Sequence, residues 1–241
     1  MRILFLSHYF PPEVSAPATR TYEHCRQWVK DGHDVTVVTC APNHPQGRVY
    51  EGYRNRIFQR ETKDGINVIR VWTFVTANEG FLKRTLNYIS YMCSVIFFSL
   101  LLPKADVVLS TSPQFFNGLA GYFVGKMRRI PWVLEIRDLW PESIVAVGAI
   151  KNQTIIKMLE WIERFAYRNA DLIVPVTDSF KAYMIGKGIE ANKIAVVKNG
   201  VDLAHYTPVD GAPALAEELG LTGKFVVSYF GTHGMAHHLE T

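Results

Sequence analysis

The sequence predicts an α/β protein built on a doubly wound parallel sheet. Short apolar runs recur along the chain, and most lack the alternation of apolar and polar residues that a half-exposed strand shows. Helices must therefore cover both faces of the sheet. Stretches with helical spacing separate these runs, and such alternation is typical of parallel sheets with right-handed crossovers. We expect a Rossmann-like doubly wound domain, followed by a truncated second domain of the same kind.

The expected strands share a richness in Val, Ile and Leu. They are residues 3–7, 34–40, 66–74, 106–110, 132–136, 171–176, 194–198 and 224–230. Between the first two, Ala18, Tyr22, Cys25 and Val29 fall on one helical face, and this helix is expected to end near Gly32.

Three further helices are expected between later strands. Ser112 and Pro113 fit an N-cap and a first helical position. An apolar stripe over residues 155–166 predicts a helix of about four turns. Asp178 or Ser179 is expected to cap the next helix, which should end near residue 186 or 188.

A domain boundary is expected after residue 203. The alternation of elements breaks at Asn199-Gly200, Pro208 and Gly211, and a short helical pattern and a new apolar strand follow. Residues 1–203 are therefore interpreted as one domain, and residues 204–241 as a linker and the first strand of an incomplete second domain.

The composition is that of an ordinary globular protein, with 241 residues, 48% hydrophobic and 20% charged. Its 26 basic and 22 acidic residues give a net charge of 26 − 22 = +4. Such a charge permits an anionic ligand or an anionic membrane surface, but it falls far short of a nucleic-acid footprint. The three cysteines show no paired metal spacing, which favours a reducing compartment.

The segment from Trp132 to Ser143 is the most informative in the chain. An apolar strand ends abruptly in Arg137-Asp138-Leu139-Trp140-Pro141-Glu142. In an open α/β sheet, ligands bind at the carboxyl ends of the strands, so this loop is a candidate site. The alternative is a structural turn, because a Trp-Pro pair can simply cover a sheet edge.

Two other loops follow expected strands. Ser15, Ala16 and Pro17 are interpreted as the start of a helix whose backbone amides can approach a phosphate. The alternatives are a loop stiffened by proline and, for His8, a structural histidine. The second loop contains Gly231 and Gly234, which permit close backbone approach to a ligand. We expect no metal there, because the nearby histidines lack an evident third ligand.

A long uncharged segment runs from Thr85 to Pro103. It is interpreted as a crossover helix or an interfacial membrane helix, with a transmembrane span as the remaining alternative. The basic loop from Arg48 to Lys63 fits the interfacial option, although a solvated, mobile loop is the simpler interpretation.

Five motifs in order resemble bacterial family 4 glycosyltransferases, in the branch that builds capsule, exopolysaccharide or O-antigen of lipopolysaccharide. They are His8–Glu13 (HYFPPE), Gly32–Thr39 (GHDVTVVT), Arg137–Ser143 (RDLWPES), Asn199–Asp202 (NGVD) and Tyr229–Glu240 (YFGTHGMAHHLE). The resemblance implies a GT-B fold, with an N-terminal acceptor domain facing a C-terminal donor domain across a cleft. It also implies a retaining hexosyltransferase-type reaction with a UDP-sugar donor and no other cofactor. Lipid-linked glycan acceptors are implied as well, so we expect a cytoplasmic protein peripheral at the inner face of the cytoplasmic membrane.

The resemblance assigns roles to particular residues. Asp138 or Glu142 would bond a sugar hydroxyl or orient the acceptor, and Arg137 would pair with one of them or face a phosphate. The departing diphosphate can accept the proton of the acceptor, so the protein's task is electrostatic. The expected donor-side residues are Ser15, Ala16, Gly231, Thr232, His233 and Gly234. The expected acceptor-side residues are His8, Glu13, Asn199 and Asp202.

The sequence departs from the family pattern at two places. Thr232, His233 and His237 stand where many relatives place Arg and Lys, and the Glu-x7-Glu motif for the donor is absent. We therefore expect a fragment that is inactive or nearly so alone. Two rivals stay open, a UDP-sugar 2-epimerase and a non-catalytic module that binds membrane or glycan. A nucleic-acid binder is the weakest option.

Overall fold

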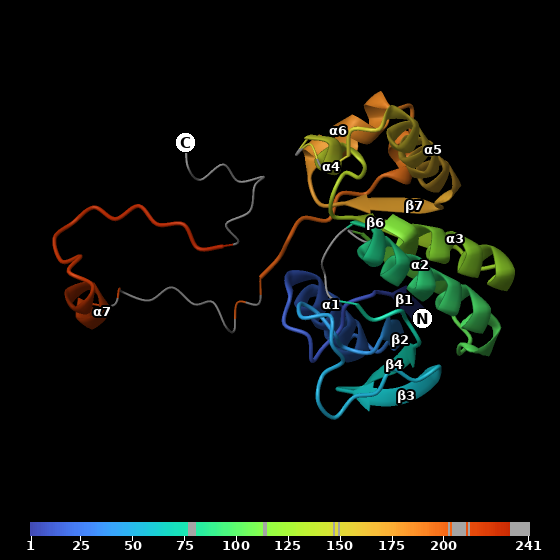
Figure 1. The fold of residues 1–241 in the computed structure, drawn as a ribbon, viewed down its shortest axis with the longest axis horizontal. Coiled ribbons are helices and arrows are strands. Elements are labelled where there is room, and N and C mark those ends of the chain that lie inside the picture. The colour runs from blue at the N-terminus through green and yellow to red at the C-terminus, as the bar shows by residue number, and fades with distance from the viewer. Residues whose placement is uncertain are drawn as a thin grey trace.

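The computed structural model describes residues 1–76, 81–112, 115–146, 148, 150–201, 203, 211 and 213–231. Its centre is a seven-stranded sheet in the order β3-β4-β2-β1-β5-β6-β7, parallel except for the edge strand β3 (Figure 1). The strands are β1 (Arg2–Leu6), β2 (Asp34–Cys40), β3 (Phe58–Lys63), β4 (Ile66–Val71), β5 (Val107–Thr111), β6 (Trp132–Ile136) and β7 (Leu172–Pro175). The doubly wound α/β fold predicted from the sequence is confirmed.

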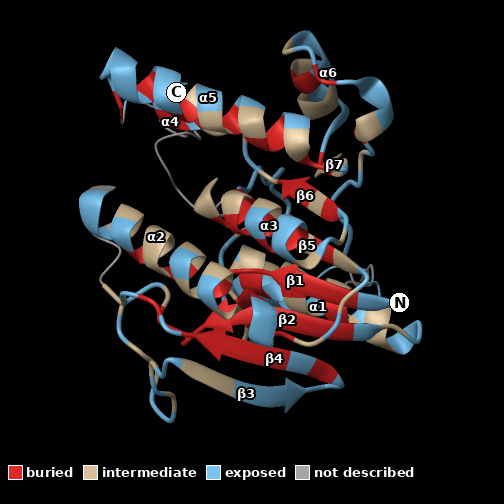
Figure 2. Ribbon diagram, turned by 90° about the vertical axis from the view of Figure 1, so that its right-hand side faces the viewer, coloured by how far each residue is buried: buried red, intermediate tan, exposed pale blue. Residues whose placement is uncertain are grey.

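Helices cover both faces of this sheet. The helices are α1 (Ala16–Lys30), α2 (Phe81–Phe98), α3 (Phe115–Arg128), α4 (Glu142–Ala146), α5 (Gln153–Asn169), α6 (Asp178–Gly186) and α7 (Pro213–Glu218), with single 3-10 turns at Ser99–Leu101 and Ala191–Lys193. On one face, α2, α3 and α5 pack into a core with β1, β2 and β6; on the other, α1 packs against the same sheet. Figure 2 shows the resulting layers, with buried strands at the centre.

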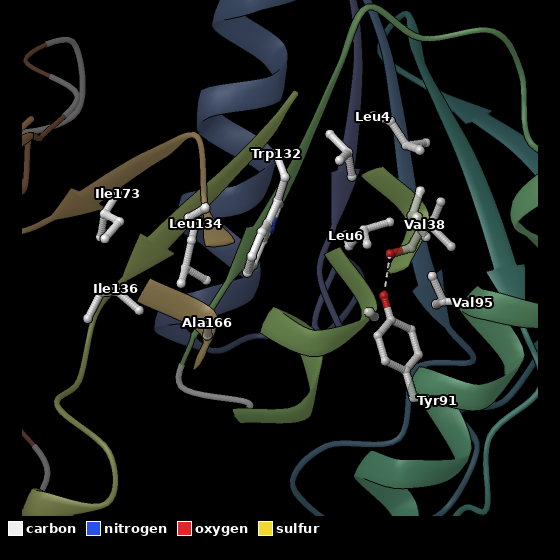
Figure 3. Packing of buried hydrophobic residues seen from close by; sticks show 14 of the residues in the cluster. Leu4, Leu6, Val38, Tyr91, Val95, Trp132, Leu134, Ile136, Ala166 and Ile173 are labelled. Carbon is white, nitrogen blue, oxygen red and sulfur yellow. Dashed lines mark hydrogen bonds between the residues drawn. The ribbon is translucent and has the colours of Figure 1, made fainter. Parts of the chain in front are cut away.

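Two hydrogen bonds inside the core connect neighbouring elements of the fold. The Tyr91 hydroxyl on α2 donates to the carbonyl oxygen of Val38 on β2 at 2.7 Å (Figure 3). The indole of Trp132 on β6 donates to Ser110 Oγ on β5 at 2.8 Å. Each bond satisfies a polar atom inside an apolar cluster, so the large rings can be buried without an unpaired donor.

Glycines let α3 approach the sheet closely. An added Cβ at Gly121 would lie 2.5 Å from Ser110 Oγ, and one at Gly125 would lie 3.2 Å from Trp132 Cβ. Contacts under 3.0 Å require neighbouring atoms to move, so Gly121 is the position where a larger residue fits least.

The sequence prediction missed strand β3, which lies in the segment that was interpreted as a basic loop. Its residues are mostly exposed because β3 is an edge strand, and a polar edge strand carries no apolar pattern. Asp64 and Gly65 join β3 to β4 with φ of 51° and 79°. Two positive φ values in a two-residue connection are typical of a type I′ hairpin, and the Asp-Gly pair was the available signal.

Two expected strands were wrong. Residues 194–198 form only a bridge from Ile194 to Ile173, supported by bonds such as that from Ala195 N to Ile173 O at 3.0 Å. Residues 224–230 form no strand, and Phe225 and Phe230 are more than nine-tenths exposed. A strand needs a neighbour for its hydrogen bonds, and the described residues offer none there. The proposed boundary at residue 203 stays a prediction.

The helix predictions are close to the observed bounds. The cap of α6 is Thr177, one residue before Asp178, the earlier of the two expected caps, and its hydroxyl accepts a bond from Phe180 N at 3.1 Å. The expected proline at position 113 lies outside the described residues. The uncharged segment becomes α2 and the following 3-10 turn. Among the described residues, no helix has the length and apolar character needed to cross a bilayer.

Candidate functional site

The candidate site lies at the carboxyl edge of the parallel strands. From β1 the chain winds outward through β2 to β4, and then crosses back to β5 and winds the other way to β7. Strands β1 and β5 are therefore neighbours at a topological switch point, where the loops after them diverge and leave a crevice. Figure 2 shows the start of α2, the start of α5 and α4 gathered at this edge.

The loop after β6 is fixed to the loop after β5. Ser112 Oγ accepts a bond from the backbone N–H of Arg137 at 2.6 Å and a longer one from Asp138 N–H at 3.4 Å. The Arg137 guanidinium donates to Asn199 Oδ1 and lies 3.6 Å from Glu135 Oε1. The structure thus brings together two predicted site residues, Arg137 and Asn199, and it shows what orients them.

The sequence analysis missed a buried ion pair beneath this loop. Arg20 on α1 donates to Glu135 Oε2 at 3.2 Å and to Thr111 Oγ1 at 2.7 Å. Glu135 therefore faces two guanidinium groups, those of Arg20 and Arg137, and the three side chains carry a net positive charge. A carboxylate inside the apolar strand 132–136 was the signal that could have revealed the pair.

Asp138 and Glu142 lie in different surroundings. Asp138 is exposed, yet desolvation by the neighbouring protein raises the pKa of its carboxyl group, and the positive charges of Arg137 and Arg20 act in the opposite direction. Glu142 begins α4 and is hydrogen-bonded to the hydroxyl of Tyr183, whose pKa rises first through desolvation and then through that bond. The two predicted catalytic carboxylates therefore have separate partners, and Asp138 is the one beside the positive charges.

The loop after β1 is held by buried polar contacts. Glu13 accepts bonds from three backbone N–H groups, with its Oε1 2.8 Å from Asn43 N and 2.9 Å from His44 N. Burial is the main cause that raises the pKa of Glu13, and these bonds lower it. Arg70 is buried, forms an ion pair with Glu61 and donates to the carbonyls of Pro11 and Cys40 at 2.8 and 2.7 Å. These contacts tie the loops after β1 and β2 together.

The other predicted residues of this loop have structural contacts. His8 is buried among aromatic rings such as Tyr91 and Tyr88, and desolvation lowers its pKa to about 3. The neutral imidazole is therefore the form present near neutral pH. Ser15 is the N-cap of α1, and its Oγ accepts a bond from Ala18 N at 3.4 Å, while Ala16 is the first helical residue. Their binding roles stay predictions.

The remaining predicted residues lie toward the C-terminus. Gly231 is exposed beside the ring of Tyr229, at the end of a segment that runs apart from the sheet (Figure 1). Asp202, Thr232, His233 and Gly234 lie outside the described residues. Within the part of the chain that the structure describes, no three His, Cys, Asp or Glu side chains gather as a metal site requires.

Three hollows follow one another along the carboxyl edge. A narrow polar pocket contains His8, His44 and Asn87, and an apolar cavity of about 190 Å³ contains Phe116, Met158 and Leu159. These two share Arg84 and Tyr88. A third hollow of about 30 Å³, beside Asp138, shares Phe115 and Trp140 with the apolar cavity. Of the residues that line the apolar cavity, the sequence analysis placed only Trp140 in a candidate site.

Comparison with known proteins decides the family, since residues 15–200 match the glycosyl transferase 4-like domain. The chain belongs to this family. The match covers the Arg20–Glu135–Arg137 group and Asn199, and it begins at Ser15, the N-cap of α1. It confirms the resemblance drawn from the five motifs.

Two relatives are similar to the chain in sequence at below 30% identity. The whole chain aligns, at 26% identity over 249 positions, with 61% of a protein of Escherichia coli (strain K12) named as a colanic acid biosynthesis glycosyl transferase, WcaI. Another alignment, at 28% identity over 143 positions, joins 57% of the chain to 35% of a protein of Pseudomonas aeruginosa named as a glycosyltransferase, WbjE. The chain thus spans less than two thirds of the length of these relatives.

Two solved structures have a fold similar to that of this chain. HepE of Anabaena, solved in complex with UDP-glucose, superposes with a TM-score of 0.53 at 17% identity, over 92% of the chain and 50% of HepE. A sucrose-phosphate synthase structure from Thermosynechococcus elongatus gives a TM-score of 0.52 at 11% identity, over 91% of the chain and 96% of that structure. These likenesses support the Rossmann-like architecture.

Proposed function

We propose that this chain is the acceptor-side half of a retaining glycosyltransferase that moves a sugar from a UDP-sugar to a lipid-linked or growing polysaccharide acceptor. The observation that carries the proposal is the family match over residues 15–200, which includes the loops after β2, β4, β5 and β6. HepE is a structural neighbour solved with UDP-glucose, which supports a UDP-sugar donor. The name of WcaI supports a role in extracellular polysaccharide synthesis.

The proposed chemistry uses the charges at the switch point. Glu135 holds Arg20 and Arg137 in place, and their two guanidinium groups supply the positive charge that a donor diphosphate beside this loop would meet. Such fixed charges stabilise the negative charge that develops on the leaving group. Asp138 accepts a hydrogen bond from the acceptor hydroxyl, which orients it, and the leaving diphosphate takes the proton.

A transfer assay tests this assignment in the longer protein that carries the donor half. With a UDP-sugar and a membrane lipid acceptor, Asp138→Asn should lower kcat/KM about ten- to hundredfold, which corresponds to one lost charge-assisted hydrogen bond. Asp106→Asn is the matched control, because Asp106 pairs with Arg2 at the opposite edge of the sheet. Equal activity of the Asp138 variant and the control would refute the role of Asp138. Absence of both nucleotide-sugar binding and transfer would refute the function itself.

The proposed location is the inner face of the cytoplasmic membrane, reached through the end of α2. Phe97, Leu100 and Leu101 are each more than 60% exposed there. Strand β3 lies against the same end, because Arg60 donates to the carbonyl of Leu101 at 3.3 Å and the ring of Phe58 lies 5.2 Å from that of Phe98. Apolar side chains beside basic ones are the combination that an anionic bilayer surface attracts.

Sedimentation with phosphatidylcholine–phosphatidylglycerol vesicles tests this location. Phe97→Asp should reduce the bound fraction, and binding should also weaken at high salt because the basic residues are screened. Phe225→Asp is the matched control, since Phe225 is equally apolar and lies in the exposed C-terminal segment. Equal loss in both variants, or no binding by the unmodified chain, would contradict the proposal.

A further inference from the structure

Glu163 is a buried carboxylate that the proposed chemistry does not use. It lies in the middle of α5, and only 2% of its surface is exposed. Its Oε2 accepts a bond from Lys187 Nζ on α6 at 2.7 Å, whereas its Oε1 has no hydrogen-bond partner among the described residues. Burial raises the pKa of Glu163, and the bond from Lys187 lowers it. A buried carboxylate oxygen without a donor is costly, so a donor for Oε1 is expected.

The hollow beside Asp138 has room for that donor. Glu163 and Asp138 both line this hollow, and Ser112 and Tyr167 add hydroxyl groups to a wall that is otherwise mainly apolar. Its volume is about 30 Å³. A buried water needs about 10–15 Å³ in the same measure, together with two to four polar partners, so the hollow can hold roughly one or two water molecules.

Ser112 connects this hollow to the loop after β6. Its Oγ accepts bonds from the backbone N–H groups of Arg137 at 2.6 Å and Asp138 at 3.4 Å. A hydroxyl also has one hydrogen of its own to donate. A water in the hollow can accept that hydrogen and donate to Glu163 Oε1. Every donor in this series then points toward the carboxylate, so the negative charge of Glu163 strengthens the bonds that hold the loop.

We propose that Glu163 is a positioning residue for Asp138, which it holds through Ser112 and through water in the hollow that these residues line. The inference rests on the proposed function, in which Asp138 orients the acceptor hydroxyl. Lys187 fixes the carboxylate of Glu163 from the other side, so α5 and α6 together support the loop after β6. Glu163 itself touches neither substrate, and it acts on transfer only by keeping this loop in place.

High-resolution crystallography and amide NMR spectra of the 241-residue chain test this connection directly. The crystal structure should show ordered water between Ser112 Oγ and Glu163 Oε1. In Glu163→Gln, Lys187 keeps the amide oxygen and the NH2 group faces the hollow, so an acceptor is replaced by a donor. The amide proton resonances of Arg137 and Asp138 should therefore shift in this variant.

Glu160→Gln is the matched control for these spectra. Glu160 lies on the same helix, pairs with Arg164 at 3.7 Å and does not line the hollow. This variant should leave both amide resonances where they are in the parent chain. The crystallographic test uses the unmodified chain, so it does not depend on the stability of any variant.

Transfer kinetics of the longer protein separate positioning from a general loss of structure. Glu163→Gln should lower kcat about tenfold through poorer orientation of the acceptor hydroxyl. The KM for the UDP-sugar should stay within about twofold, because Glu135 and Asn199 still hold the Arg137 guanidinium. Ser112→Ala breaks the connection at its other end and should lower kcat at least about tenfold. Adding Glu163→Gln to Ser112→Ala should then change kcat by less than about twofold.

The inference would be overturned by a crystal structure without water between Ser112 and Glu163, or by equal effects of Glu163→Gln and Glu160→Gln on the amide resonances. Additive effects of Glu163→Gln and Ser112→Ala on kcat would also overturn it, because Glu163 would then act only through its pair with Lys187.

The ordered water and the amide resonances do not depend on sugar transfer. If both are as expected and the longer protein neither binds nor transfers a nucleotide-sugar, the proposed function is wrong and the connection stands. If transfer occurs while the water and the resonance shifts are absent, the connection is wrong and the function stands.

Discussion

Among the described glycines, Gly121 leaves the least room for a side chain, and this predicts a large effect from a single methyl group. In Gly121→Ala, the new Cβ would lie 2.5 Å from Ser110 Oγ and 2.8 Å from Ser110 Cβ, and it would also collide with the indole nitrogen of Trp132. The Trp132–Ser110 hydrogen bond occupies the same space. To relieve the overlap, α3 must move outward or the indole must rotate, and either movement disturbs that bond.

Three contributions set the size of the effect. Overpacking a core costs about 1–3 kcal/mol. Leaving a buried hydrogen-bonding group unpaired costs about 1–3 kcal/mol. Replacing glycine by alanine inside a helix stabilises the helix by about 1 kcal/mol, which offsets part of these costs. The free energy of unfolding should therefore fall by roughly 3 kcal/mol, within a range of about 1–5 kcal/mol, and the Tm should fall by about 6–12 °C for a domain of this size.

Urea unfolding followed by circular dichroism measures the effect, and Gly118→Ala is its matched control. Gly118 is buried on the same helix, but its Cβ would meet its nearest neighbour, Leu134 Cδ1, at an ordinary 3.4 Å. That variant should be as stable as the parent or more stable by up to about 1 kcal/mol. In a Trp132→Phe background, Gly121→Ala should cost less than in the parent chain. Strict additivity of the two changes, or equal stability of the two alanine variants, would refute the steric explanation.

Three further predictions concern the loops at the carboxyl edge. The folded-state pKa of His8 is about 3, below the ordinary 6.5, so the unfolded chain binds a proton first and stability is lost as pH falls from about 6.5 toward 3. Between pH 7 and 5 the free energy of unfolding should fall by about 2 kcal/mol through this residue, and urea titrations of His8→Gln at the two pH values should show that this loss is gone. The same pH dependence in the variant and the parent chain would contradict the role of His8. Arg70→Met should lower the free energy of unfolding by about 2–4 kcal/mol, because it leaves buried carbonyls and Glu61 without their partner. Arg70→Lys should restore only part of this loss, because lysine lacks the planar set of N–H donors of a guanidinium group. Full restoration by lysine would show that this planar donor set is not needed. Ser15→Ala should cost about 1 kcal/mol as a lost N-cap and Ser15→Asp should not, as read from thermal unfolding; equal losses in both would exclude capping as the cause.

The strands that the sequence predicted well are those buried on both faces. Strands β2 and β6 have the bounds that the apolar runs predicted. A strand that lies between two layers of helices must be apolar on both faces, so runs rich in Val, Ile and Leu mark such strands directly. Strand β3 escaped because its sequence, FQRETK, forms an exposed edge whose pairing depends on a hairpin turn and not on an apolar pattern. Residues 224–230 have the opposite property: an apolar run is present, but within the described part of the chain no neighbouring strand satisfies its backbone.

The candidate site was predicted in part for a similar reason. The loop that contains Arg137 and Asp138 could be found because charged residues directly follow an apolar strand. The partnership of Arg20 with Glu135 could not, because the two residues are 115 positions apart and meet only when the fold brings the side chain of Arg20 to the end of β6. The pairing of Arg137 with Asn199 likewise depends on the path of the chain after β7, which no local pattern specifies.

The edge of the apolar cavity has a consequence for how this surface can change during evolution. Ile155 and Met158 are exposed residues of the first turns of α5, whereas its buried side chains, such as Ile156 and Leu159, hold the helix in place. Substitutions at the two exposed positions can alter the width and polarity of the entrance with little loss of stability. This entrance can therefore change by single steps that leave the sheet and its charged group unchanged.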